Sequence, residues 1–321
     1  MVRPHNFRPF PFMTRTLKAG VAGAGVFGGF HARKYAGLEA VEFAAVYDIH
    51  PDRARALADE LGARAFTDMA AFLEAASDVV TIASPAVAHG AEVRQALEAG
   101  RHVYVEKPIS DDLDGAHALV RLARDRGLVL AAGHQERAVF RAMGLLDLPE
   151  RPLRMEAVRH GTPSPRNLDV SVVLDLMIHD LDLALVLADV DIESVEAEGA
   201  APVGPGLDQC EAEVVFEGGM TAVFKSSRVA DRRERTMHVV FPSGELWLDF
   251  LTHEFSNTTP FALDAGWAAT PQGKDPLGAS VADFLAAVRG EIPRPLVTGE
   301  EAACALDLAL RIEVVAAATT D

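Results

Sequence analysis

Two short segments of the 321-residue chain carry residues that can move a proton and a hydride together. In the first, Lys107 stands between Glu106 and Pro108; in the second, Asp175 precedes His179 by four positions. An imidazole beside a carboxylate can accept the proton of an alcohol near neutral pH. A fixed ammonium can stabilise the oxygen anion that develops as the carbon loses hydride. The candidate catalytic residues are therefore Lys107, Asp175 and His179.

Both segments also have a simpler interpretation. Pro108 restricts the residue before it, so we expect Lys107 in an extended conformation at a strand end, although a lysine before a turn is often only solvated. Asp175 and His179 share a face if residues 169–187 form one helix, and an ordinary helix pair at that spacing contributes only roughly a few tenths of a kcal/mol. We favour the chemical interpretation because strand ends are where open parallel sheets bind ligands.

A glycine-rich turn suggests the cofactor. Residues 23–28 read Gly-x-Gly-x-x-Gly, after an apolar segment at 17–22 and before a helical pattern at 30–36. The first glycine permits the tight turn, the second lets a pyrophosphate approach the backbone, and the third lets helix and strand pack closely. The phosphates would lie at the helix N-terminus. The candidate cofactor-binding residues of this turn are Gly23, Gly25, Val26, Phe27 and Gly28.

The second expected strand, 41–47, favours NAD over NADP. It ends at Asp48, twenty positions after Gly28. A carboxylate there accepts hydrogen bonds from the adenosine ribose and repels a 2′-phosphate. Arg53 keeps NADP as a minority alternative, and Asp48 has a simpler interpretation as a helix cap before Pro51.

The rest of the first part alternates between expected strands (78–83, 102–105, 128–132) and helices (69–76, 86–99, 115–126). This alternation predicts an α/β Rossmann domain over residues 17–136. Ligands of such sheets bind beyond the carboxyl ends of the strands. The residues near that rim are the candidate cofactor contacts Ser84, Pro85, His89, Glu106 and Lys107 and the candidate substrate contact His134.

After residue 187 the pattern changes to successive strands, near 195–200, 211–216, 221–227, 237–241 and 245–250. With 153–159 they predict a C-terminal α+β domain over 137–321, which has a largely antiparallel open sheet and two closing helices, 277–289 and 298–317. The helix with His179 would cover one face. The candidate substrate-binding residues here, besides Lys107, are Arg137, Arg159, Arg166, Asn167, Asp175 and His179; the arginines and the asparagine are equally interpretable as solvated surface.

Composition excludes several classes of partner. The net charge of −17 argues against nucleic acid, and no apolar run reaches the roughly 18 residues of a membrane span. Residues 1–16 lack the apolar core of a secretory signal, so we expect a flexible tail, with Met13 as an alternative start. Cys210 and Cys304 have no metal-ligand spacing, which predicts no metal site and a reduced, cytoplasmic compartment.

Together, the glycine turn, the Glu-Lys-Pro segment and the Asp-x-x-x-His segment resemble those of the glucose–fructose oxidoreductase/inositol dehydrogenase (Gfo/Idh/MocA) family. The resemblance runs from about Leu17 to the C-terminus. In that family the lysine, the aspartate and the histidine are catalytic, which assigns those roles by resemblance to Lys107, Asp175 and His179. It also implies a homodimer or homotetramer assembled through the open sheet.

The chain departs from the family pattern twice. Many members have a glycine pair shortly before the helix aspartate, where this chain has 170–174 without glycine, and a Thr-Pro pair where it has Ser84-Pro85. The run 169–180 resembles the UDP-N-acetylglucosamine 3-dehydrogenase subgroup. We therefore expect an NAD-dependent oxidoreductase acting on a secondary hydroxyl of a sugar or nucleotide sugar. The alternatives are a cyclitol or other ring substrate, and an NAD-binding sensor or scaffold without turnover.

Overall fold

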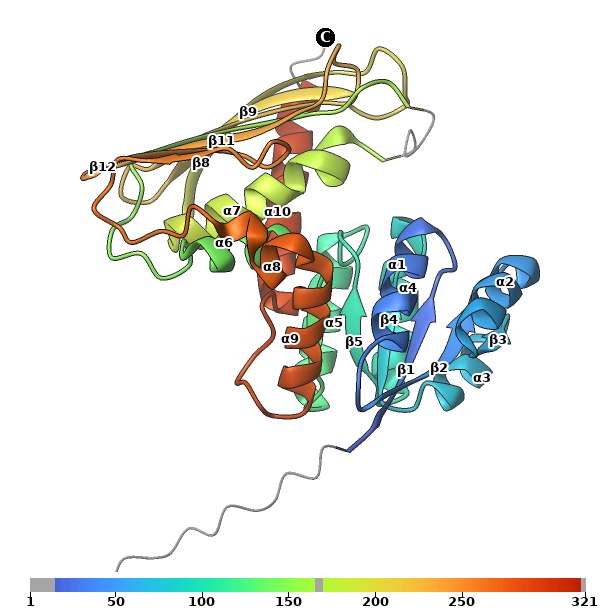
Figure 1. The fold of residues 1–321 in the computed structure, drawn as a ribbon. Coiled ribbons are helices and arrows are strands. Elements are labelled where there is room, and N and C mark those ends of the chain that lie inside the picture. The colour runs from blue at the N-terminus through green and yellow to red at the C-terminus, as the bar shows by residue number, and fades with distance from the viewer. Residues whose placement is uncertain (1–14, 165–169, 319–321) are drawn as a thin grey trace, which may run out of the picture.

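The computed structural model describes residues 15–164 and 170–318, which form two sheets with helices packed against each (Figure 1). Two predicted substrate-binding residues, Arg166 and Asn167, lie outside the described residues, as does most of the predicted tail. The division of the chain at residue 136 stays a prediction.

The first sheet is parallel throughout and has the strand order β3-β2-β1-β4-β5-β6. This is the order of dinucleotide-binding folds. The central strand β4 is fully buried because helices cover both faces of the sheet. The strands are β1 (Leu17–Ala22), β2 (Val41–Tyr47), β3 (Arg64–Phe66), β4 (Val79–Ile82), β5 (His102–Val105) and β6 (Leu130–Ala132).

The helices between these strands confirm the predicted alternation, with ends that differ from the predicted ones by no more than four residues. The side chains of Asp68 and Asp112 accept backbone N–H groups and so mark the starts of α3 and α5. The short strand β3 and the helix α2 were not predicted. The helices are α1 (Val26–Ala36), α2 (Pro51–Leu61), α3 (Met69–Ala75), α4 (Ala86–Glu98) and α5 (Leu113–Asp125).

The second sheet has seven strands in the order β13-β12-β11-β7-β10-β9-β8. Every neighbouring pair is antiparallel except β7 and β10, which confirms the largely antiparallel prediction. Three helices cover one face, as Figure 1 shows: α6 (Glu136–Met143), α7 (Ile178–Ala188) and α10 (Gly299–Ala318). The strands are β7 (Arg154–His160), β8 (Ile192–Ala200), β9 (Gln209–Phe216), β10 (Thr221–Ser227), β11 (Glu234–Phe241), β12 (Gly244–Asp249) and β13 (Phe255–Asn257).

The prediction of one continuous α-helix over 169–187 is wrong. Residues Val173–Met177 form a π-helical turn, η1, and only Ile178–Ala188 form the α-helix α7. A π-turn holds an extra residue, so it shifts the spacing at which side chains share a face. Such turns occur frequently at functional sites. The interruption falls between the side chains of Asp175 and His179, and it changes what each of them contacts.

The C-terminal segment joins the two sheets. It holds η2 (Trp267–Ala269), α8 (Pro271–Lys274), α9 (Pro276–Val288) and α10 (Gly299–Ala318), and the two closing helices are thereby confirmed. Phe284 of α9 is fully buried against Tyr104 of the first sheet, and Thr298 bridges to Ala131 of β6. The long helix α10 contacts α5 at one end and α7 and β8 at the other. The first core therefore includes residues from the far end of the chain.

Candidate active site

The glycine turn and Asp48, together called the cofactor cradle below, fit a pyrophosphate. Gly23 has φ +95°, and a Cβ there would lie 2.5 Å from the backbone nitrogen of Ser84. A Cβ at Gly28 would lie 1.7 Å from the Gly23 carbonyl oxygen, whereas one at Gly25 would enter open space with nothing within 4 Å. The N-terminus of α1 has no side-chain cap and no acidic residue in its first turn. Its N–H groups can therefore bind an anion.

Asp48 ties β2 to the glycine turn. Its carboxylate accepts the backbone N–H groups of Ala24 and His50, each at 2.8 Å, and the residue is only 7% exposed. The helix-cap interpretation is wrong, because α2 begins at Pro51 without a side-chain cap. Each carboxylate oxygen keeps a further lone pair for a ribose hydroxyl. Arg53 lies exposed on α2.

His89 joins two loops at the rim of the first sheet. Its ring nitrogens lie 2.7 Å from the Pro108 carbonyl oxygen and 2.9 Å from that of Ser84. The ring is buried, and burial lowers its pKa. Its nitrogens thus face protein carbonyls, an arrangement that suits a positioning role, and its direct contact with the cofactor stays a prediction. Pro85 remains exposed at the rim, and the hydroxyl of Ser84 donates to Glu92 at 2.6 Å.

Glu106 is locked at the end of β5. It is 7% exposed, and its Oε1 lies 2.6 Å from Nε2 of His31 and accepts the amide N–H of Gln135 at 2.9 Å. Burial by itself would raise the pKa of Glu106, but the hydrogen bond and charge of His31 and the charge of Lys107 outweigh it and lower this pKa. The buried carboxylate therefore holds the strand end from which Lys107 projects, and it points away from solvent.

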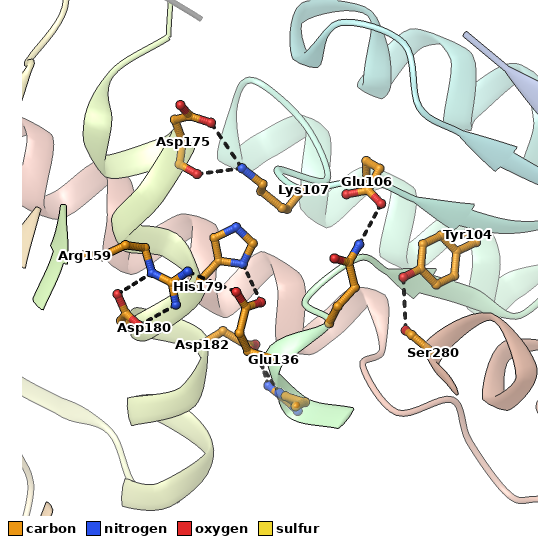
Figure 2. A network of polar contacts seen from close by, with 12 residues as sticks. Tyr104, Glu106, Lys107, Glu136, Arg159, Asp175, His179, Asp180, Asp182 and Ser280 are labelled. Carbon is orange, nitrogen blue, oxygen red and sulfur yellow. Dashed lines mark hydrogen bonds and ion pairs between the residues drawn. The ribbon is translucent and has the colours of Figure 1, made fainter. Parts of the chain in front are cut away.

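Lys107 reaches from the first sheet to the π-turn. Its Nζ donates to the backbone carbonyl oxygen of Asp175 at 2.6 Å and lies 3.4 Å from Oδ1 of the same residue. Figure 2 shows this contact across the site. Both side chains are largely buried, at 15% and 21% exposed. The ammonium is therefore held in place by a residue 68 positions away, and it remains partly open to the site.

His179 has a carboxylate partner that the sequence analysis missed. Its Nδ1 lies 2.8 Å from Oε2 of Glu136, at the start of α6 (Glu136–Met143), although the ring N–H does not point along the contact. In Figure 2 the His179 ring is turned toward Glu136, while Asp175 is bound to Lys107. The prediction that Asp175 lies beneath the His179 ring is thereby corrected, because the π-turn directs the two side chains to different partners. These four candidate catalytic residues, Lys107, Glu136, Asp175 and His179, are called the catalytic centre below.

Glu136 stays ionised in this setting. Burial alone would raise its pKa, but the charges of His179 and Arg159 outweigh it and hold the pKa of Glu136 well below its ordinary value. The Oε1 of Glu136 accepts a hydrogen bond from Arg159 at 3.0 Å. An ionised carboxylate beside the ring stabilises the imidazolium that forms when His179 takes a proton. One signal was available in the sequence: Glu136 lies two residues after His134, just beyond the end of β6.

Two arginines predicted to bind the substrate, Arg137 and Arg159, are paired within the protein. Arg137 donates to both oxygens of Asp182 at 2.7 Å and to Glu301 at 2.7 Å. Arg159 donates to both oxygens of Asp180 at 2.8 Å. Both guanidinium groups are almost fully buried. A buried cation must be paired, and these two are paired within the protein, so their role as substrate contacts stays a prediction.

His134 packs behind the catalytic centre. It is 1% exposed, and its ring centroid lies 6.3 Å from that of His179 in an edge-on arrangement. Burial lowers the pKa of His134 and so favours its neutral ring. The ring lies where it can support His179, and its contact with substrate stays a prediction. Over the described ranges, no group of three metal-ligating side chains occurs.

The sequence matches a family in two segments. The family described as "Oxidoreductase family, NAD-binding Rossmann fold" matches residues 17–134, and the GFO/IDH/MocA C-terminal domain matches residues 155–247. The first segment includes the cofactor cradle and Lys107, and the second includes Asp175 and His179. In the part of the chain that the structure describes, no helix is long and apolar enough to cross a membrane.

Individual relatives narrow the similarity. UDP-N-acetylglucosamine 3-dehydrogenase from Acidithiobacillus ferrooxidans is 36% identical over 286 residues, which are 86% of this chain and 90% of that protein. A solved structure of that enzyme has a TM-score of 0.84 at 32% identity and covers 94% of this chain and 98% of its own. Myo-inositol 2-dehydrogenase from Thermotoga maritima is 28% identical over 240 residues, 67% of this chain and 69% of that protein.

Proposed function

The chain belongs to the GFO/IDH/MocA family of NAD-binding oxidoreductases, and from this premise we propose that it oxidises the C3 hydroxyl of UDP-N-acetylglucosamine to a ketone. Its class is an NAD-dependent oxidoreductase that acts on a CH–OH group of a sugar or nucleotide sugar. The named substrate rests on one observation: the 36% identity with the Acidithiobacillus enzyme extends over 86% of this chain.

The catalytic centre supports the following division of labour. NAD, when bound, accepts the hydride of the carbon that carries the hydroxyl. His179 takes the hydroxyl proton, and the ionised Glu136 stabilises the charge that the ring gains. Lys107 stabilises the negative charge that develops on the substrate oxygen. Asp175 positions Lys107 through its backbone carbonyl and its carboxylate.

The cofactor contacts remain those of the cradle and its rim. Val26 and Phe27, at the start of α1, are apolar yet 56% and 46% exposed. Such exposure suits side chains that a bound nucleotide covers. Ser84 and Pro85 follow β4, and the backbone nitrogen of Ser84 lies next to Gly23 of the cradle. Asp48, rather than a basic residue, at the ribose position supports NAD as the cofactor.

The test is the absorbance of reduced nicotinamide with purified protein, NAD or NADP, and a trap for ketone products. The substrate panel holds UDP-N-acetylglucosamine, its uronic acid, free hexoses and inositols. We expect NAD reduction with UDP-N-acetylglucosamine. Turnover of free sugars or inositol, without the nucleotide sugar, would overturn the named substrate and keep the oxidoreductase class. If no compound of the panel leads to reduction of NAD or NADP, the alternative of an NAD-binding sensor without turnover is favoured.

A cyclitol is the second candidate substrate. The myo-inositol 2-dehydrogenase of Thermotoga maritima supports it, but the similarity is lower and covers less of this chain. The two candidates differ in charge, because a nucleotide sugar brings a diphosphate and a cyclitol does not. Substrate profiling therefore separates them in one experiment.

We further propose that the protein is a cytoplasmic homodimer or homotetramer. The helix-free face of the second sheet supports the oligomer, because half-exposed side chains alternate along β9 and β10 there. The location rests on two free cysteines, one buried and one exposed. Light scattering after gel filtration tests the oligomer, and a monomeric mass would overturn it.

A further inference from the structure

The second sheet carries a half-buried arginine beside the catalytic centre that forms no ion pair with the residues that the structure describes. Arg235 on β11 lies directly opposite Arg159 on β7. Side chains opposite one another in an antiparallel pair leave the same face. That face is the helix-covered one, because Met237 and Val239, two and four positions along β11, are buried in its core. Arg235 therefore projects toward the helices that carry the catalytic centre.

No side chain of the described ranges bonds the guanidinium of Arg235, although the carboxylates of Glu136 and Asp180 lie near enough to favour its charge. Among residues 15–164 and 170–318, none of its guanidinium nitrogens is sealed from solvent. The nearby carboxylates Asp180 and Glu136 are already bonded to Arg159. Burial and the charge of Arg159 act against the charged form and lower the pKa of Arg235, although a guanidinium stays protonated.

Such an arrangement destabilises the free protein. Like charges directly opposite on neighbouring strands repel, and partial burial of an unpaired cation removes its hydration. An anionic ligand would reverse both effects. Among the described cations around the catalytic centre, Arg137 and Arg159 are each bonded to a buried carboxylate, and Lys107 is assigned to the substrate oxygen.

We propose that Arg235 binds the diphosphate of the substrate, an inference that rests on the proposed function. The site is close enough: Arg159, the cross-strand neighbour of Arg235, lies 3.0 Å from Glu136, which lies 2.8 Å from His179. A sugar whose hydroxyl reaches His179 carries its phosphates on the far side of one ring. A planar guanidinium can bind phosphate oxygens in a bidentate manner. Arg235 then selects nucleotide sugars over free sugars and cyclitols.

The experiment measures the binding of UDP and of uridine to the NADH-loaded protein by titration calorimetry. Arg235→Gln should weaken UDP binding about 10- to 100-fold, the range for loss of a charge-assisted hydrogen bond, and leave uridine binding unchanged. Arg233→Gln, which removes an exposed charge two residues away, is the matched control and should bind UDP like the wild type. Equal UDP affinity in wild type and Arg235→Gln would overturn the proposal. So would a wild type that binds UDP no better than uridine.

Two further readouts separate this proposal from a folding defect and from the proposed function. Arg235→Gln should melt at the same temperature as the wild type or higher, because it relieves the repulsion from Arg159. Arg235→Lys keeps the charge without the planar fork and should bind UDP with intermediate affinity. If the wild type oxidises UDP-N-acetylglucosamine but Arg235→Gln does not weaken UDP binding, only the phosphate contact is overturned. If Arg235→Gln weakens UDP binding but the wild type does not oxidise the nucleotide sugar, only the proposed reaction is overturned.

Discussion

The cofactor cradle and the catalytic centre are built in different ways. The cradle consists mainly of backbone, and apart from Asp48 it lies within the six consecutive positions of the turn at residues 23–28. The catalytic centre consists of charged side chains whose contacts span long sequence separations, such as 68 positions between Lys107 and Asp175. A site made of local backbone depends on which residues can adopt its conformation. A site made of distant ion pairs depends on the packing of both sheets.

The largest effect on activity should come from His179→Ala. Without a proton acceptor we expect kcat to fall by about 10²- to 10⁴-fold, while NAD binds as before, because the cradle does not involve His179. Single-turnover kinetics and a fluorescence titration with NADH measure the two effects. His117→Ala, an exposed histidine on α5, is the control. Equal activity of wild type and His179→Ala would remove this ring from the mechanism.

The largest effect on stability should come from Arg137→Ala. It leaves the buried Asp182 without its partner, so we expect the free energy of unfolding to fall by about 3–5 kcal/mol. Adding Asp182→Leu should restore part of that loss, since no carboxylate then stays buried and unpaired. Urea denaturation measures both variants. A loss below about 1 kcal/mol, the size of an exposed ion pair, would show that the pair does not join α6 and α7.

Two alanine substitutions in the cradle should affect different properties, one the stability of the fold and the other the affinity for NAD. Gly28→Ala places a methyl 1.7 Å from a backbone oxygen, so we expect a loss of about 1–3 kcal/mol in the free energy of unfolding. Gly25→Ala meets nothing within 4 Å, so the protein should keep its Tm and bind NAD more weakly. Thermal melts and NADH titrations distinguish them. Unchanged NAD affinity in Gly25→Ala would place the pyrophosphate elsewhere.

A smaller effect on activity should follow Glu136→Gln. The amide keeps the shape of the side chain and removes the charge that stabilises protonated His179, so we expect kcat to fall about tenfold, or about 1.4 kcal/mol. Asp175→Asn, which acts on Lys107 instead, serves for comparison. If Glu136→Gln has wild-type kcat while Asp175→Asn does not, the orienting role returns to Asp175.

The smallest effect concerns stability at low pH. The pKa of Glu136 is held well below its ordinary value of 4.5, mainly by the charges of His179 and Arg159. A depressed pKa means that its ion pairs stabilise the fold fully above the unfolded value, and that this stability is lost as pH falls toward the folded one. Glu136→Gln should therefore lose less stability than the wild type between pH 5 and about 3. Urea denaturation at each pH measures the free energy of unfolding of both proteins. If it falls by the same amount in the wild type and in Glu136→Gln over this range, the prediction is wrong.

Features that depend on neighbours in the sequence were predicted correctly, whereas contacts between distant residues were not. The glycine turn, the alternation of strands and helices in the first part and the antiparallel second sheet all carry local patterns, such as positive φ at Gly23 and alternating burial along β9. No local pattern indicated that Glu136 is the partner of His179. The spacing of four residues favoured Asp175 as that partner, but the π-turn, for which the sequence has no evident signal, directs the Asp175 side chain elsewhere. For Arg137 and Arg159, likewise, nothing local indicates that their carboxylates lie on α7.

The sequence by itself determined the fold class, the cofactor cradle and the strand end that presents Lys107, because backbone sterics and side-chain periodicity act between near neighbours. Only the tertiary structure decided which charges meet. It bonded Lys107 to Asp175, brought Glu136 to His179, and left Arg235 facing a paired Arg159. The physical reason is that a Coulomb interaction depends on distance in space, which sequence separation does not set.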